Sequence, residues 1–150
     1  MKRLLFVMVF VLATTVGYAQ DAYIELLRSD VKTKKVAIIT EAMQFTNEEA
    51  KAFWPVYREY EFELTKIGDG RLELIKDYAQ NYETMTDEKA KELVDRALKL
   101  EGKRTKLKKK YFKKFDKVLS SKTAAKFFQL ENQINLLIDL QIASELPLIK

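Results

Sequence analysis

Apolar residues recur every three or four positions along most of the chain, the period at which side chains share one face of an α-helix. No stretch alternates apolar and polar residues over the length of a strand. Two long segments, residues 53–78 and 93–118, keep a spacing of four and three that is typical of a coiled-coil seam. The pattern therefore predicts an all-α protein that contains a long antiparallel helical hairpin.

Three similar segments predict where helices begin. Each has an apolar residue, a hydroxyl residue, three mostly polar residues and an alanine. The segments start at Phe45-Thr46, Met85-Thr86 and Leu119-Ser120. The hydroxyl can accept a hydrogen bond from a free N–H of the first turn, and the apolar residue packs against that turn. We therefore expect four helices, over residues 22–43, 46–82, 86–118 and 120–146, with Pro147 ending the last.

Two features leave the course of the second helix open. Pro55 lies in its third turn and has no N–H to donate, so we expect a bend near Phe53-Trp54-Pro55. Each glycine in a helix interior costs about 1 kcal/mol, and two occur in Gly68-Asp69-Gly70. The spacing favours a continuous helix there, and a hinge is the alternative.

The connection between the second and third helices sets how they pair. A turn at Glu83-Thr84-Met85 places Phe53 opposite Phe115, Tyr57 opposite Tyr111, and Arg71 opposite Ala97, whose small side chain leaves room for the arginine to reach water. We also expect Glu131 or Asn132 to hydrogen-bond into the Pro55 bend, and the apolar tail from Glu145 to dock on a neighbouring helix.

The first nineteen residues have the features of a secretory signal. Met1, Lys2 and Arg3 precede an apolar run, residues 4–16, which is followed by Gly17-Tyr18-Ala19. Cleavage after Ala19 leaves residues 20–150 as a single all-helical domain. The run is shorter than the ~20 apolar residues of a membrane-spanning helix, so we expect no stable span after cleavage. The predicted location is the periplasm.

The composition argues against catalysis. The chain has no cysteine and no histidine, which excludes thiol chemistry and removes the usual general base of a hydrolase. A transition-metal site would need carboxylates alone. The acidic pairs Glu48-Glu49 and Asp87-Glu88 lie in first helical turns, where the helix dipole already accounts for them. We expect no catalytic residue, no metal site and no cofactor, and hence no enzyme.

A basic run is the strongest charge feature. Residues 99–117 carry ten Lys or Arg against Glu101 and Asp116, which indicates an acidic partner. Acidic residues 59, 61 and 63 of the facing helix are expected to neutralise part of it inside the hairpin. The net charge of the whole chain is only +5, so nucleic-acid binding is not implied.

Aromatic residues outside the seams give a second candidate surface. A thin array of helices cannot bury this many rings, and the remaining apolar area would serve a homodimer or a ligand. The residues expected to bind a partner on these basic and aromatic surfaces are Lys103, Lys106, Lys109, Lys110, Phe112, Lys113 and Phe62.

These features resemble the Spy/CpxP family of periplasmic proteins, also called the LTXXQ-motif family. The motif-like segments are Phe45-Thr46-Asn47-Glu48-Glu49, with Phe for Leu and Glu for Gln, and Leu119-Ser120-Ser121-Lys122-Thr123, with Ser for Thr and Thr for Gln. Two further segments, residues 53–57 and 127–132, look like those of a divergent, uncharacterised branch of the family. The motif and structural residues that the resemblance indicates are Phe45, Thr46, Phe53, Trp54, Pro55, Leu119, Ser120, Phe127, Phe128, Gln129, Glu131 and Asn132.

The resemblance implies a cradle-shaped antiparallel dimer of long helices. It also implies an ATP-independent chaperone of the envelope stress response, which holds unfolded envelope proteins on a basic and apolar surface. A zinc role, associated with another branch, is not expected here because His and Cys are absent. The alternative is a signalling or structural protein that binds one defined partner, such as a sensor domain, with saturable one-to-one stoichiometry.

Overall fold

The computed structural model describes residues 31–149, and the predicted signal and the start of the helix expected at residues 22–43 lie outside them. The chain divides into two compact units, Met1–Ala42 and Met43–Lys150. In the first unit the described residues, 31–42, are helical. The helix ends at residue 43, as expected.

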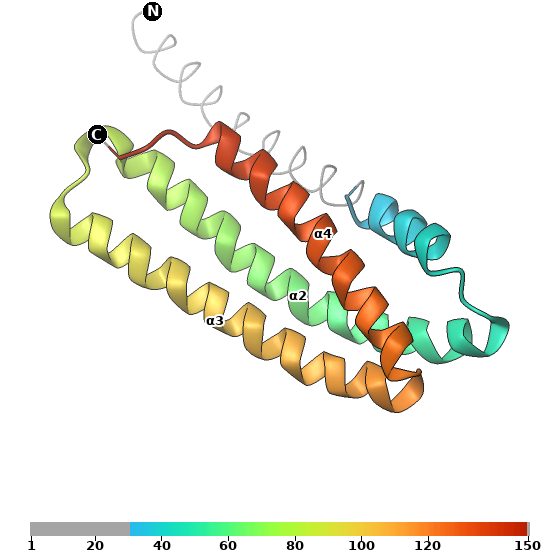
Figure 1. Cartoon of the computed structure of the whole chain (residues 1–150). Helices are drawn as coiled ribbons and strands as arrows, with labels where there is room; N and C mark the ends of the chain where they lie inside the picture. Colours follow the sequence, from blue (N-terminus) through green and yellow to red (C-terminus); the bar gives the residue numbers. More distant parts are fainter. Residues whose placement is uncertain (1–30, 150) are drawn as a thin grey trace, which may run out of the picture. The chain divides into compact units, whose positions relative to one another are not determined.

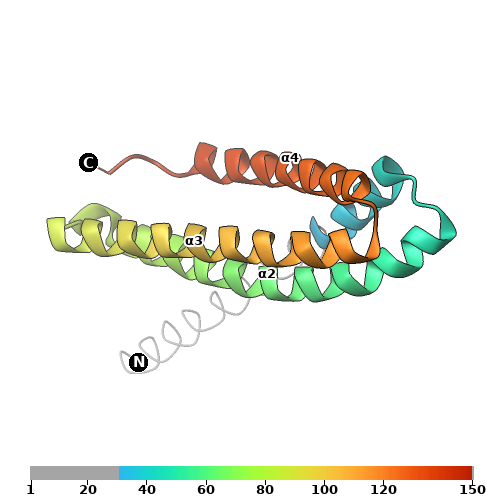
Figure 2. The same cartoon turned by 60° about the horizontal axis from the view of Figure 1, so that its bottom comes forward.

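The second unit holds three long helices, α2 (Asn47–Asn81), α3 (Asp87–Val118) and α4 (Ser121–Glu145), with a 3₁₀ turn, η1 (Tyr82–Thr84), after α2. The helices α2 and α3 lie side by side as an antiparallel hairpin (Figure 1). Helix α4 lies as a second layer over this hairpin (Figure 2). The part of the chain that the structure describes contains no strand, and the predicted all-α fold with four helices is confirmed.

All three predicted caps are present. The Thr46 hydroxyl accepts from the Glu49 N–H at 3.2 Å, and the Glu49 carboxylate accepts from the Thr46 N–H at 3.0 Å, which completes a capping box. Thr86 accepts from the Lys89 N–H at 3.2 Å, and Ser120 accepts from the Thr123 N–H at 3.1 Å. Short local signals therefore fix the starts of α2, α3 and α4.

Helix α2 runs unbroken through its glycine pair, so the hinge alternative is wrong. Gly70 is where the two hairpin helices approach closely, because a Cβ built there would lie 2.9 Å from Cδ2 of Leu100. Nothing lies within 4 Å of the equivalent position at Gly68. The helix also continues through Pro55, whose ring lies on an exposed face.

An aromatic cluster forms the core where α2 begins, α3 ends and α4 begins. The rings of Phe53, Phe115 and Phe127 are fully buried, with centroids 4.8–5.2 Å apart. The predicted contact between Phe53 and Phe115 is confirmed. Tyr111 packs against Tyr60 at 5.3 Å rather than directly against Tyr57, because the seam side chains interdigitate instead of facing one another singly.

Polar contacts attach α4 to the hairpin, and they correct two expectations. Arg71 pairs with Asp139 of α4 instead of extending freely past Ala97, and Arg104 binds the other oxygen of Asp139 at 3.1 Å. The buried Glu131 carboxyl accepts from Tyr60 at 3.3 Å and from the Asn135 side chain at 2.9 Å.

The expectation that Glu131 or Asn132 reaches the Pro55 bend is therefore wrong. Asn132 is exposed, and its side-chain oxygen accepts from Lys108 of α3 at 3.5 Å. Consecutive residues of a helix point about 100° apart, so residue 132 faces α3 when residue 131 faces the buried seam.

The C-terminal tail docks on α2, as expected, but through its backbone. The Tyr78 hydroxyl donates to the Pro147 carbonyl at 2.6 Å, and the Tyr82 hydroxyl donates to the Leu148 carbonyl at 3.2 Å. The Leu148 side chain remains 89% exposed. Hydrogen bonds rather than apolar burial therefore hold the tail.

Candidate binding surface on α3

Two sets of basic residues can be distinguished along the basic run of α3, residues 99–117, and the first set is paired. Lys114 binds Glu59 of α2 at 2.6 Å, Arg104 binds Asp139, and Lys108 binds Asn132. The hydrogen bond and charge of Lys114 lower the pKa of Glu59, and Glu59 in turn raises the pKa of Lys114. The expected neutralisation inside the hairpin is thus present at Glu59, although Glu63 pairs within its own helix with Lys66 at 3.1 Å.

The second set forms a row, which we call the lysine stripe. Its members recur at alternating spacings of four and three residues and therefore share one face of α3. They are Lys99, Lys103, Lys106, Lys110, Lys113 and Lys117. All six are exposed, and within residues 31–149 none of them forms an ion pair or hydrogen bond. Lys110 lies over the Tyr111 ring, with its ammonium 5.3 Å from the centroid.

An open groove of about 440 Å³ runs between α2 and α3 beside the stripe. Three stripe residues, Lys103, Lys106 and Lys110, line one side. Glu63 and Lys66 lie on the opposite side. Its apolar lining comes from Ile67, Leu100 and Leu107, of which Leu107 is buried and the other two are half-buried. The groove therefore combines cations with an apolar floor.

Of the other predicted client-binding residues, Lys113 belongs to the stripe and Lys109 is exposed beside it. Phe62 is 64% exposed and adjoins the groove through Lys66, whose ammonium lies 4.3 Å from its ring centroid. Phe112 is 37% exposed and packs against Phe128 of α4 at 5.5 Å, so it belongs to a different face from the groove.

Most residues indicated by the family resemblance have structural roles. Phe53 and Phe127 are core residues, Phe45 packs on Phe53 at 4.5 Å, and Thr46 and Ser120 are helix caps. Trp54 packs edge-on against Phe53 at 5.1 Å, and the Leu119 N–H donates to the Phe115 carbonyl at 2.8 Å. Gln129 is exposed, like Pro55.

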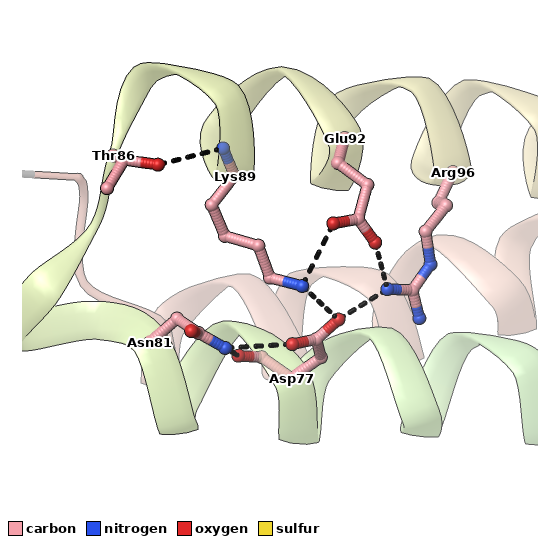
Figure 3. A network of polar contacts seen from close by, with 6 residues as sticks. All are labelled: Asp77, Asn81, Thr86, Lys89, Glu92 and Arg96. Carbon is pink, nitrogen blue, oxygen red and sulfur yellow. Dashed lines mark hydrogen bonds and ion pairs between the residues drawn. The ribbon is translucent and has the colours of Figure 1, made fainter.

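A charge network at the tip of the hairpin differs from the stripe because its charges are balanced. Asp77 binds Lys89 at 2.9 Å and also Arg96, and Glu92 binds both cations at 3.0 and 3.1 Å (Figure 3). Asn81 donates to Asp77 at 2.8 Å. Hydrogen bonds from the two cations lower the pKa values of Asp77 and Glu92, and the same bonds raise those of Lys89 and Arg96. This network joins α2 to α3 and leaves little charge for a ligand.

The sequence interpretation missed three members of the surface. Lys99 and Lys117 complete the stripe, and their place in the repeat of four and three is visible in the sequence. Lys66 comes from α2, and only the packing of α2 against α3 brings it to the groove. No cluster of acidic side chains that could hold a metal ion occurs in the described part of the chain. None of its described helices is both long and apolar enough to cross a bilayer.

Comparisons of the chain with protein-family models, with curated proteins and with solved structures found no match.

Proposed function

We propose that the chain is an exported, ATP-independent holding protein that keeps unfolded envelope proteins soluble. The observation that carries this proposal is the groove between α2 and α3, in which the unpaired Lys103, Lys106 and Lys110 stand beside an apolar floor. Such a surface suits a polypeptide that presents both acidic and apolar side chains.

The two parts of the surface have different tasks. Unpaired cations attract acidic segments from a distance, which accelerates encounter at low ionic strength. The apolar floor, formed by Ile67, Leu100 and Leu107, then holds apolar side chains over a small area. An open groove binds loosely and accommodates many sequences, whereas a deep pocket selects one. No nucleotide is needed for either step.

Two further features support the proposal. The predicted signal would deliver the protein to the envelope, where ATP is scarce, and the resemblance to the Spy/CpxP family implies this activity. A homodimer belongs to the same proposal, because α4 exposes leucines that a second copy would cover. Leu136, Leu137 and Leu140 are 59%, 69% and 67% exposed.

Light scattering of a heat-unfolded or reduced client tests the proposal, with residues 20–150 added in the absence of ATP at low and high salt. We expect suppression of aggregation at near-stoichiometric amounts, weakened by salt. A variant with Lys103, Lys106 and Lys110 changed to Gln should lose most of the suppression. The matched control changes three exposed lysines elsewhere, Lys51, Lys91 and Lys122, to Gln and should retain it.

Failure to suppress aggregation of several unrelated clients would reject holding. It would favour the alternative of one defined partner, such as the sensor domain of an envelope-stress pathway. The regular spacing of the lysine stripe is the observation in favour of that alternative. Titration that saturates at one partner per chain would then identify it.

A further inference from the structure

We propose that the lysine stripe docks an acidic amphipathic helix on which Glu or Asp recur at the same alternating spacing of three and four residues. This inference deepens the proposed function, because it names the conformation in which an acidic segment binds.

The stripe is a straight row of charge. From Lys99 to Lys117 it spans roughly 27 Å at 1.5 Å per residue, with a cation about every 5.3 Å. Arg104, which turns toward α4, and Lys114, which turns toward α2, are both paired there. The stripe residues share another face of α3, and within the described residues none of them forms an ion pair, although the charge of Lys110 helps to lower the pKa of Glu59.

The spacing of the row matches a helix better than an extended chain. A helix with acidic residues at positions three and four apart carries a negative charge every ~5.3 Å, the same repeat as the stripe. An extended strand presents side chains on one side every ~6.7 Å, so its charges fall half a repeat out of register after about two lysines. A helical segment therefore stays in register with all six lysines, whereas a strand does not.

The groove floor adds a second requirement on the partner. Leu100 and Leu107 are seven residues apart, and both line the groove beside stripe lysines. A docked helix with one apolar residue in each heptad would place these residues along this floor. The expected partner thus combines two acidic positions and one apolar position per heptad.

The test uses two synthetic peptides of 21 residues with the same composition. One has Glu at two positions and Leu at one position of every heptad, and the other has the same residues in an order without that period. Fluorescence anisotropy with residues 20–150 at low salt measures the affinity, and circular dichroism measures the helix content gained on binding. We expect the periodic peptide to bind about tenfold more tightly and to become helical.

Substitutions locate the binding face. Changing Lys99, Lys106 and Lys113 to Gln removes alternate members of the stripe and should weaken the periodic peptide about tenfold. The control with Lys51, Lys91 and Lys122 changed to Gln should bind as the unaltered protein does. All six lysines are exposed, so both variants should fold, and their circular dichroism spectra verify this.

Three results would overturn the inference. These are equal affinity for the two peptides, binding without a gain of helix, and equal weakening by the control substitutions. Tighter binding of polyphosphate or single-stranded DNA than of the periodic peptide would also overturn it, in favour of a flexible polyanion.

The light-scattering assay separates this inference from the proposed function. If clients are held but the peptides bind equally, the helical docking fails and the holding function stands. If the periodic peptide binds selectively but no client is held, the holding function fails and the helical docking stands.

Discussion

At the scale of single residues, the two glycines of α2 have different surroundings. A methyl group at Gly68 meets nothing within 4 Å, whereas one at Gly70 meets Leu100 at 2.9 Å. Both glycines lie inside a continuous helix with ordinary helical geometry, since no described glycine has a positive φ. Of the two positions, only residue 70 would therefore require the end of the Leu100 side chain to move if alanine replaced glycine.

We expect Gly68→Ala to stabilise the fold by about 0.5–1 kcal/mol, because alanine loses less backbone entropy on folding. Gly70→Ala should be less stable than Gly68→Ala by about 1 kcal/mol, since the Leu100 side chain must move. Urea unfolding of the two variants measures the difference. Equal stabilities would show that Leu100 adapts without cost.

Two buried tyrosines make the fold sensitive to alkali. Burial, followed by the charges of Glu61 and Glu131, raises the pKa of Tyr57, and burial followed by the charge of Glu131 raises that of Tyr60. The folded state therefore keeps protons that the unfolded state releases above about pH 10.

We expect the free energy of unfolding to fall as the pH rises above about 10. Urea unfolding at a series of alkaline pH values measures the slope. The double variant Tyr57→Phe/Tyr60→Phe should show a shallower slope, while Tyr78→Phe, at an exposed hydrogen bond, serves as the control. An unchanged slope in the double variant would assign the alkaline effect to other groups.

At the scale of elements, α4 is held differently along its two halves. Its buried residues, Ala124, Phe127, Glu131, Ile134 and Asn135, all lie in the first part. Beyond them, Asp139 pairs with Arg71 and Arg104 of the hairpin, and two tyrosine hydroxyls bind the tail that follows α4. The distal half therefore has no fully buried side chain, and these polar contacts help to attach it to the hairpin.

We expect Asp139→Asn to loosen this half. Amide exchange in residues 136–146 should become about three- to tenfold faster, and exchange in residues 121–134 should stay unchanged, because the latter pack on the aromatic core. Hydrogen exchange followed by mass spectrometry measures both segments. The matched control is Asp77→Asn, which removes a similar carboxylate from the tip network and should leave α4 unchanged. Equal acceleration along the whole of α4 would refute the distinction.

Acid should loosen the distal half of α4 in the same way as Asp139→Asn. Partial burial favours the neutral form of Asp139, but Arg71 and Arg104 outweigh it and hold the pKa of the carboxyl below its ordinary value of 3.8. The stabilisation from these pairs is therefore complete above about pH 4 and is lost as the pH falls through the lower folded pKa.

The elements differ in how far sequence can predict them. Caps at Thr46, Thr86 and Ser120 were predictable because each depends on residues within one turn. The pairing of Phe53 with Phe115 followed from the position of the connecting turn. The contact of Arg71 with Asp139 was not predictable, because it depends on the angle at which α4 crosses the hairpin, and no local pattern encodes that angle.

At the scale of the whole molecule, the positive charge is unevenly distributed. The tip network pairs two acids with two cations, whereas the lysine stripe places six like charges on one face of α3. Like charges three or four residues apart on a helix repel by about 0.2–0.5 kcal/mol per pair. The lysine stripe therefore lowers the stability of the helix that carries it. This repulsion can be inferred from the spacing of the lysines in the sequence alone.

A triple variant should raise the free energy of unfolding by about 1 kcal/mol at low salt, because it removes several repulsive pairs. The variant changes Lys106, Lys110 and Lys113 to Gln. At high salt the gain should largely vanish, since screening already weakens the repulsion. Thermal unfolding at two salt concentrations measures both effects. A loss of stability at both concentrations would show that these lysines stabilise the fold.

The aromatic cluster also has a consequence for the order of assembly. Phe115 and Phe127 meet across the short connection between α3 and α4, whereas Phe53 and Phe115 meet across the entire hairpin. The first loop is roughly one fifth as long, so closing it costs about 1.4 kcal/mol less chain entropy. During synthesis, the contact between Phe115 and Phe127 can form only after the final third of the chain has been made. Helix α2 is synthesised earlier, and it can then pack against the surface that this contact provides.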